Sequence, residues 1–300
     1  MNSINNLLKS EAWRNTKSHI PLALGLDEFN RPLIADFHRM PHLLITGSHP
    51  GSGKAACLHA IIASLVDRFA PDELRLLMVD LKTTELQRYS DLPHLVAPII
   101  TNKKQTTAAA HWVVDEVEKR HLILTRIGVY STRYFNQRAK AVPPPVWVDS
   151  LAGRAEADEL VIPARFPYIV VILNEFQVLN HVCDKALPSR GARIRMMSRA
   201  AGVHCISAAN ISGSDNLTEI IECSQPARIT FDMEACEDSA EPHQQPGNSA
   251  LFYHPSNSSK VVRAKAAFIS DTELQEIVKA NAAPGKPNYE PELLEQMHAN

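Results

Sequence analysis

The stretch His42-Leu-Leu-Ile-Thr46, followed by Gly47-Ser-His-Pro-Gly-Ser-Gly-Lys54-Ala55, decides the expected fold of this 300-residue chain. An apolar strand runs into a glycine-rich turn and then into a helical pattern, as in a phosphate-binding loop. In such loops the glycines let backbone N–H groups surround the phosphates, and the lysine reaches the β and γ oxygens. The predicted nucleotide-binding residues are Gly51, Ser52, Gly53, Lys54 and Ala55.

Three features of this loop depart from the usual pattern. Ala55 stands where a serine or threonine hydroxyl would ligate Mg²⁺. The interval from Gly47 to Gly53 is one residue too long, unless Ser48 occupies the first glycine position. Pro50 removes one N–H donor from a loop that binds through N–H groups. We therefore expect an ATP site with a weakened Mg²⁺ site.

Composition narrows the class of protein. A hydrophobic content of 45% over this length is enough for one large α/β domain. The formal net charge of −2 gives no overall positive field for nucleic acid, although a local basic surface remains open. Five cysteines without a C-x-x-C pair fit reduced thiols better than disulfides or zinc. With no long apolar run, we expect a soluble, cytoplasmic chain without membrane contact.

Apolar runs alternate with helical patterns along the chain, and several runs are continuous in Val, Ile and Leu, as in parallel strands covered on both faces. The pattern predicts a doubly wound, mainly parallel sheet with helices on both faces. The expected strands are His42 to Thr46, Leu74 to Val79, Leu95 to Ile100, Tyr168 to Leu173, Val203 to Ala208 and Arg228 to Phe231. The expected helices are Lys54 to Phe69, Lys103 to Ile127, Arg193 to Ala201, Asn216 to Cys223 and Thr272 to Ala280.

The chain divides into one large domain with two flanking segments. We expect a weakly ordered N-terminal segment over 1–19, the domain over 20–281 and a poorly packed tail over 282–300. Prolines and polar residues predict irregular insertions near 141–167 and 237–248.

A second chemical signal follows the strand that ends at Leu173, where the sequence continues Asn174-Glu175. Many P-loop ATPases have two carboxylates here, one near Mg²⁺ and one that orients the attacking water. Glu175 retains the second role in this prediction. Asn174 offers only a neutral oxygen to a cation that prefers carboxylates. Two interpretations of Asn174 stay open, a degenerate metal position and a hydrogen-bonded strand-end amide.

From about Ile20 to Ala280 the chain resembles the motor domain of the FtsK/SpoIIIE family of DNA translocases. The resemblance rests on short blocks in matching order, among them Met40-Pro-His-Leu-Leu44, Gly51-Ser-Gly-Lys54, Val79-Asp-Leu-Lys82, Pro93-His-Leu95, Pro167-Tyr-Ile-Val170 and Arg199-Ala-Ala-Gly-Val-His204. It implies a RecA-like P-loop ATPase fold. It also implies a hexameric ring that pumps double-stranded DNA during cell division and chromosome segregation.

The resemblance assigns roles to individual residues. Lys54 would contact the β and γ phosphates, and Glu175 would be the catalytic carboxylate. The family's sensor glutamine falls on Asn210, so that motif is largely lost. Arg228 is retained and is a candidate for facing a neighbouring subunit's nucleotide.

Four arginines, at positions 190, 193, 195 and 199, lie close together in the sequence. Arg190, Arg193, Arg195 and Arg199 are candidates for DNA phosphate contacts, whereas a solvated helix face or a subunit contact is the favoured alternative. Altogether we expect a nucleotide-binding and DNA-binding family member with impaired hydrolysis. The alternatives are a fully active ATP-dependent translocase and a non-catalytic structural or regulatory subunit that binds partner proteins.

Overall fold

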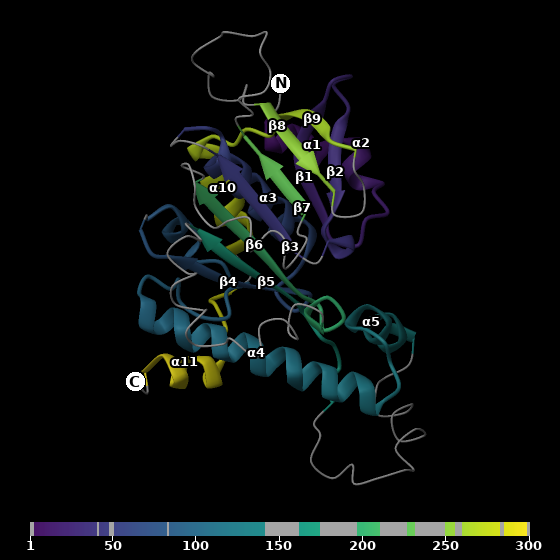
Figure 1. Ribbon diagram of the computed structural model, residues 1–300, viewed down its shortest axis with the longest axis vertical. Coiled ribbons are helices and arrows are strands. Elements are labelled where there is room, and N and C mark those ends of the chain that lie inside the picture. Colours follow the sequence, from purple (N-terminus) through teal and green to yellow (C-terminus); the bar gives the residue numbers. More distant parts are fainter. Residues whose placement is uncertain are drawn as a thin grey trace.

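The computed structural model describes residues 3–40, 42–47, 51–82, 84–141, 162–174, 197–210, 227–231, 250–255, 260–282 and 285–298. These residues form a nine-stranded sheet in the order β2-β1-β9-β8-β7-β3-β6-β5-β4, with helices packed on it (Figure 1). The α/β fold expected from the sequence is therefore confirmed. The predicted helix from Asn216 to Cys223 lies outside the described residues, as do residues 193–196 of the one from Arg193 to Ala201, residues 142–161 of the insertion near 141–167, and the insertion near 237–248.

The elements follow one another from α1 (Ile4–Lys9) to α11 (Pro291–His298). The strands are β1 (Pro21–Asp27), β2 (Pro32–Asp36), β3 (His42–Gly47), β4 (Leu74–Asp80), β5 (Tyr168–Asn174), β6 (Val203–Asn210), β7 (Ala227–Thr230), β8 (Ala250–His254) and β9 (Val262–Ala266). The other helices are α2 (Glu11–Arg14), α3 (Lys54–Arg68), α4 (Lys103–Arg126), α5 (Thr132–Ala141) and α10 (Asp271–Ala282), with 3₁₀ turns η1 (Phe37–Arg39) and η2 (Glu85–Tyr89).

The parallel half of the sheet consists of β7, β3, β6, β5 and β4. Alternate side chains of these strands enter two separate cores. In β4, Leu76 and Met78 pack in the core that includes α3, whereas Leu77 and Val79 pack in the core that includes α4 and α11. Because both faces are covered, these strands are largely apolar, which is why the sequence revealed them.

The other half of the sheet corrects the prediction of a mainly parallel arrangement. Strands β8, β9, β1 and β2 pair antiparallel and lie together at one end of the sheet, so the whole sheet is mixed (Figure 1). The predicted strand from Leu95 to Ile100 is also wrong. It makes only isolated parallel bridges, Leu76 with Leu95 and Val79 with Ile100, and Pro98 between them has no N–H to donate to a ladder.

Both chain ends are better packed than we expected. The side chains of Ile4 and Trp13 are buried in the α3 core, and the Trp13 indole N–H donates to an Asp67 carboxylate oxygen at 2.9 Å. At the other end, Leu293 and Met297 of α11 are buried against the α4 core. Helices α1 and α11 have only six and eight residues, which is too short for helical periodicity to be recognised reliably in the sequence. The boundaries at 20 and 281 remain predictions.

A buried arginine joins α4 to the starts of two parallel strands. Arg120 is 2% exposed, and its guanidinium donates to Glu116, to the Pro167 carbonyl at 2.7 Å and to the Ala201 carbonyl at 3.1 Å. These carbonyls lie just before β5 and β6. The contact fixes where the strands begin relative to α4.

Two buried histidines make the fold sensitive to acid. Burial lowers the pKa of His204 in β6 to about 3, with smaller contributions from the nearby charges of His42 and His38. Burial likewise lowers the pKa of His59 in α3 to about 4, and its Nδ1 lies 2.8 Å from the Tyr89 hydroxyl. Both folded-state pKa values lie below the ordinary histidine pKa of 6.5. Between the folded pKa and 6.5, each histidine therefore binds more protons in the unfolded chain than in the folded chain.

We expect the free energy of unfolding to fall as the pH is lowered from about 7 to about 5. Each of the two histidines should contribute a loss of roughly 1 to 2 kcal/mol in this window. Urea unfolding at the two pH values measures the loss. A His204→Gln variant should show a shallower dependence than the parent chain, and equal slopes in the two proteins would contradict this assignment.

Candidate nucleotide site

The carboxyl ends of the parallel strands meet at one edge of the sheet. In the register of the ladder, Gly47 at the end of β3 lies opposite Asn210 at the end of β6, and Asp80 at the end of β4 lies opposite Asn174 at the end of β5. Ligands of open α/β sheets bind outside this edge. The predicted nucleotide residues follow β3 directly and therefore lie at the same edge.

The glycines of the loop have the backbone conformations that the motif requires. Gly51 has a φ of 89° and Gly53 a φ of 109°, in the region that residues with a Cβ rarely adopt. Helix α3 begins immediately afterwards at Lys54, whose side chain is 9% exposed. No acidic residue lies in the first turn of α3, so the partial positive charge of its N-terminus is available to an anion. Positions 48–50 lie outside the described residues, so the roles of Ser48 and Pro50 remain predictions.

The strand-end position Asn174 is buried and hydrogen-bonded. It is 4% exposed, and its Nδ2 donates to Oδ1 of Asp80 at 3.4 Å. Asp80 is 1% exposed, and its Oδ2 accepts the Leu86 N–H at 3.1 Å. By the alternation of side chains along β4 and β5, Asp80 and Asn174 lie on the α3 side of the sheet with Leu76, Met78 and Ile172. This contact agrees with the interpretation of Asn174 as a hydrogen-bonded amide.

Two of the described residues at this edge, Ala55 and Asn174, offer Mg²⁺ neither a carboxylate nor a hydroxyl. Magnesium is held by oxygen ligands, mainly carboxylates, hydroxyls and phosphates. Ala55 supplies no side-chain oxygen, and Asn174 turns a nitrogen toward the neighbouring carboxylate. In the described part of the chain, no group of three or more His, Cys, Asp and Glu side chains could hold a metal ion.

Other predicted residues lie away from the loop. Arg228 in β7 lies opposite Leu44 of β3 and His254 of β8 and is half-buried. Arg199 is exposed and precedes β6, which places it toward the amino edge of the sheet, opposite the loop. Glu175, Arg190, Arg193, Arg195 and the side chain of Asn210 lie outside what the structure describes.

The sequence analysis did not identify Asp80 as part of the site. Its sequence signals were its position directly after the apolar run from Leu74 to Val79 and its place in the block Val79-Asp-Leu-Lys82. The partner of Asp80 follows from the register between β4 and β5, which a single sequence does not reveal.

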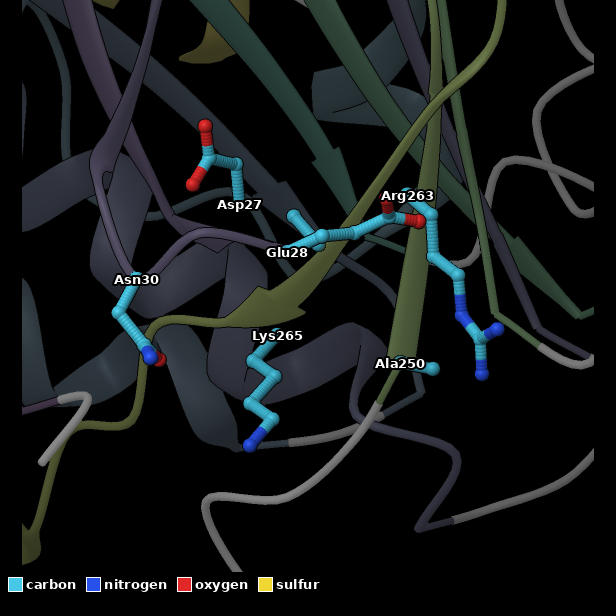
Figure 2. Close-up of a pocket in the computed structure, with 7 residues that line it drawn as sticks. Asp27, Glu28, Asn30, Ala250, Arg263 and Lys265 are labelled. Atoms are coloured by element: carbon cyan, nitrogen blue, oxygen red, sulfur yellow. The ribbon is translucent and has the colours of Figure 1, made fainter.

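A hollow of about 460 Å³ lies elsewhere, at the antiparallel end of the sheet. Figure 2 shows its lining of charged and polar side chains, with Asp27, Glu28 and Asn30 from the end of β1 and its turn and Arg263 and Lys265 from β9. Asp27 is already engaged by Arg31, whose guanidinium lies 2.8 Å from its carboxylate. Its described lining residues come from β1, the turn after it, β8 and β9.

Within the part of the chain that the structure describes, none of the helices combines the length and the apolar character needed to span a bilayer. The expectation of a chain without membrane contact was made from the sequence and stays a prediction.

Comparisons with solved structures support the fold. The chain is similar to the cytoplasmic domain of the type VII secretion ATPase EccC of Thermomonospora curvata, with a TM-score of 0.71 and 21% identity over 97% of this chain and 35% of that one. It is also similar to the pCW3 conjugation coupling protein TcpA in its monomer form with ATPγS, with a TM-score of 0.62 and 19% identity over 88% of this chain and 71% of that one. At these identities the likeness concerns the fold alone.

Sequence comparisons identify the family. The chain is 34% identical over 307 residues to the DNA translocase FtsK of Haemophilus influenzae and 33% identical over 298 residues to that of Pseudomonas syringae pv. syringae. These alignments cover 97% and 96% of this chain, which spans 57% and 37% of the length of the two relatives. The model of the FtsK/SpoIIIE family matches residues 3–226. This chain therefore belongs to the FtsK/SpoIIIE family.

Proposed function

We propose that this chain binds ATP at Gly51 to Ala55 and hydrolyses it slowly or not at all. The observation that carries the proposal is the hydrogen bond from the Asn174 amide to Asp80, at the position where a magnesium-binding carboxylate is expected. Ala55 removes a second magnesium ligand from the same edge. Two of the protein groups that would hold the metal are thus replaced by groups that hold it poorly.

Binding and hydrolysis place different demands on this site. The backbone N–H groups of the loop, Lys54 and the N-terminus of α3 can hold phosphates without a carboxylate. Phosphoryl transfer depends almost wholly on positioning and on neutralising charge around the phosphates. Losing metal ligands together should therefore lower the rate by several orders of magnitude, on the order of 10³-fold or more, while affinity persists.

We further propose that the partner is double-stranded DNA and that the chain assembles with copies of itself as a hexameric ring in the cytoplasm. Support comes from the relatives, which are named DNA translocases, and from the matched family. Arg199 and Arg228 are the described candidates for DNA and subunit contacts. Roles in cell division and chromosome segregation belong to the same proposal.

A second candidate function is that of a non-catalytic regulatory or structural subunit. The Asn174 contact supports this function too, and a complete lack of ATP turnover would favour it over slow hydrolysis. A fully active translocase, with Mg²⁺ held by phosphates, water and Glu175, is the opposing alternative. The rate of ATP turnover and its dependence on DNA distinguish these three functions.

We expect steady-state ATP hydrolysis to be the same in the parent chain and in Lys54→Ala, with and without long double-stranded DNA. The reason is that the parent already lacks two metal ligands, so removing the lysine has little catalysis left to abolish. Equilibrium binding of ATP, measured in parallel, should be weakened at least about tenfold by Lys54→Ala because a charge-assisted contact to phosphate is lost. DNA-stimulated hydrolysis that depends on Lys54 would instead establish a working motor.

The loop should also be sensitive to a side chain at Gly47, the last residue of β3. A Cβ built at Gly47 would lie 2.2 Å from the Ser52 hydroxyl oxygen and 3.1 Å from its Cβ. Ser52 is 1% exposed, so it has little room to move away. Gly47→Ala should therefore displace the loop and weaken ATP binding by about tenfold or more, equivalent to roughly 1.4 kcal/mol.

A matched second variant tests this steric explanation. Adding Ser52→Gly to Gly47→Ala removes both clashing atoms, so ATP binding should recover toward the level of Ser52→Gly alone. Weak binding that persists in the double variant, beyond that of Ser52→Gly, would show that the Ser52 contact is not the cause.

A further inference from the structure

Both carboxylate oxygens of Asp80 have partners of their own. Oδ2 accepts the Leu86 N–H at 3.1 Å, within the first turn of η2, so it holds that 3₁₀ turn against the end of β4. Oδ1 accepts from Asn174 Nδ2 at 3.4 Å, across the parallel pair of strands. Asp80 therefore joins three elements in a place where it is 1% exposed.

The side chain at position 174 faces the Asp80 carboxylate, so its charge affects the stability of the pair. A carboxylate at this position would stand opposite the Asp80 carboxylate, with 4% and 1% exposure at the two residues. Two carboxylates that share a buried site cannot both stay ionised without a compensating charge. A neighbouring positive side chain, a bound cation or a shared proton is then required. An amide instead donates a hydrogen bond to the carboxylate and needs neither.

We propose that Asn174 stands in for a divalent cation at this edge, so that the pair Asp80–Asn174 is stable without metal. A single change, Asn174→Asp, then creates a two-carboxylate site on β4 and β5 that takes Mg²⁺ or Mn²⁺. The pair lies at the same edge as the proposed ATP site. It is nevertheless a property of the folded chain alone, and it holds whether or not nucleotide is bound.

The test compares the thermal unfolding of four nucleotide-free proteins in EDTA and in millimolar Mn²⁺ or Mg²⁺: the parent chain, Asn174→Asp, Asp80→Asn and the double variant in which the two residues are exchanged. The parent should be insensitive to metal. Asn174→Asp should unfold about 5 °C lower in EDTA, because like charges are buried together, and recover in Mn²⁺. Direct Mn²⁺ titration should find one site in Asn174→Asp that the parent lacks.

The exchanged variant is the matched control. With the amide on β4 and the carboxylate on β5, the hydrogen bond between the strands is restored in the opposite direction, and the amide oxygen can still accept the Leu86 N–H. This protein should unfold near the parent temperature in EDTA and show no Mn²⁺ site. Asp80→Asn alone leaves two amides and should show no Mn²⁺ site either.

Three results would overturn the proposal. One is an Asn174→Asp protein as stable as the parent in EDTA. Another is a destabilised Asn174→Asp protein, or one that does not fold, that Mn²⁺ fails to restore. The third is a parent chain that itself gains stability from Mn²⁺. Since no nucleotide is present, these outcomes are independent of whether the parent binds or hydrolyses ATP.

Discussion

The parallel register of β3, β6, β5 and β4 is the constraint on which the rest of the structure depends. It brings Gly47, Asp80 and Asn174 to one edge, and the alternation of side chains turns Asp80 and Asn174 toward α3. A shift of one residue would turn a strand's whole set of side chains to the α4 face. The packing of Leu76 and Met78 under α3, and of Leu77 and Val79 under α4, makes that shift costly. The apolar core thereby decides which polar groups meet at the edge.

Two groups of residues at this edge differ in their expected roles, phosphate binding and metal binding. The positive φ angles of Gly51 and Gly53, the start of α3 and Lys54 would form the phosphate-binding part of the proposed ATP site. The side chains that would hold a metal are a different set, and here Ala55 and Asn174 have changed it. The apolar cores that position the loop are formed by other residues. Under the proposed function, phosphate binding and phosphate transfer would therefore be separable in this chain.

The sequence predicted the parallel half of the fold well because those strands are buried on both faces and read as continuous apolar runs. It did not reveal β9, where exposed Arg263 and Lys265 alternate with buried alanines, or β8, which is short. It overestimated Leu95 to Ile100, whose apolar residues line the core without forming a ladder. At the site, local spacing identified the loop and Asn174. The contact of Asp80 with Asn174 was not predicted, because it depends on pairing between strands that are far apart in the sequence. Such pairing leaves no local sequence pattern.

The Asp80–Asn174 pair links the retained fold to the altered chemistry. In an ATPase site a bound cation offsets the charge of protein carboxylates and that of the phosphates at once. Here the Asn174 amide donates a hydrogen bond to the Asp80 carboxylate, so the ends of β4 and β5 pack stably without a bound ion. In the proposed ATP site the phosphate side would be left to Lys54 and to the N-terminus of α3, which would attract the nucleotide but would not replace a metal in the transition state. In the site as proposed, the amide at position 174 would stabilise the strand ends without metal and lower the rate of catalysis for the same electrostatic reason.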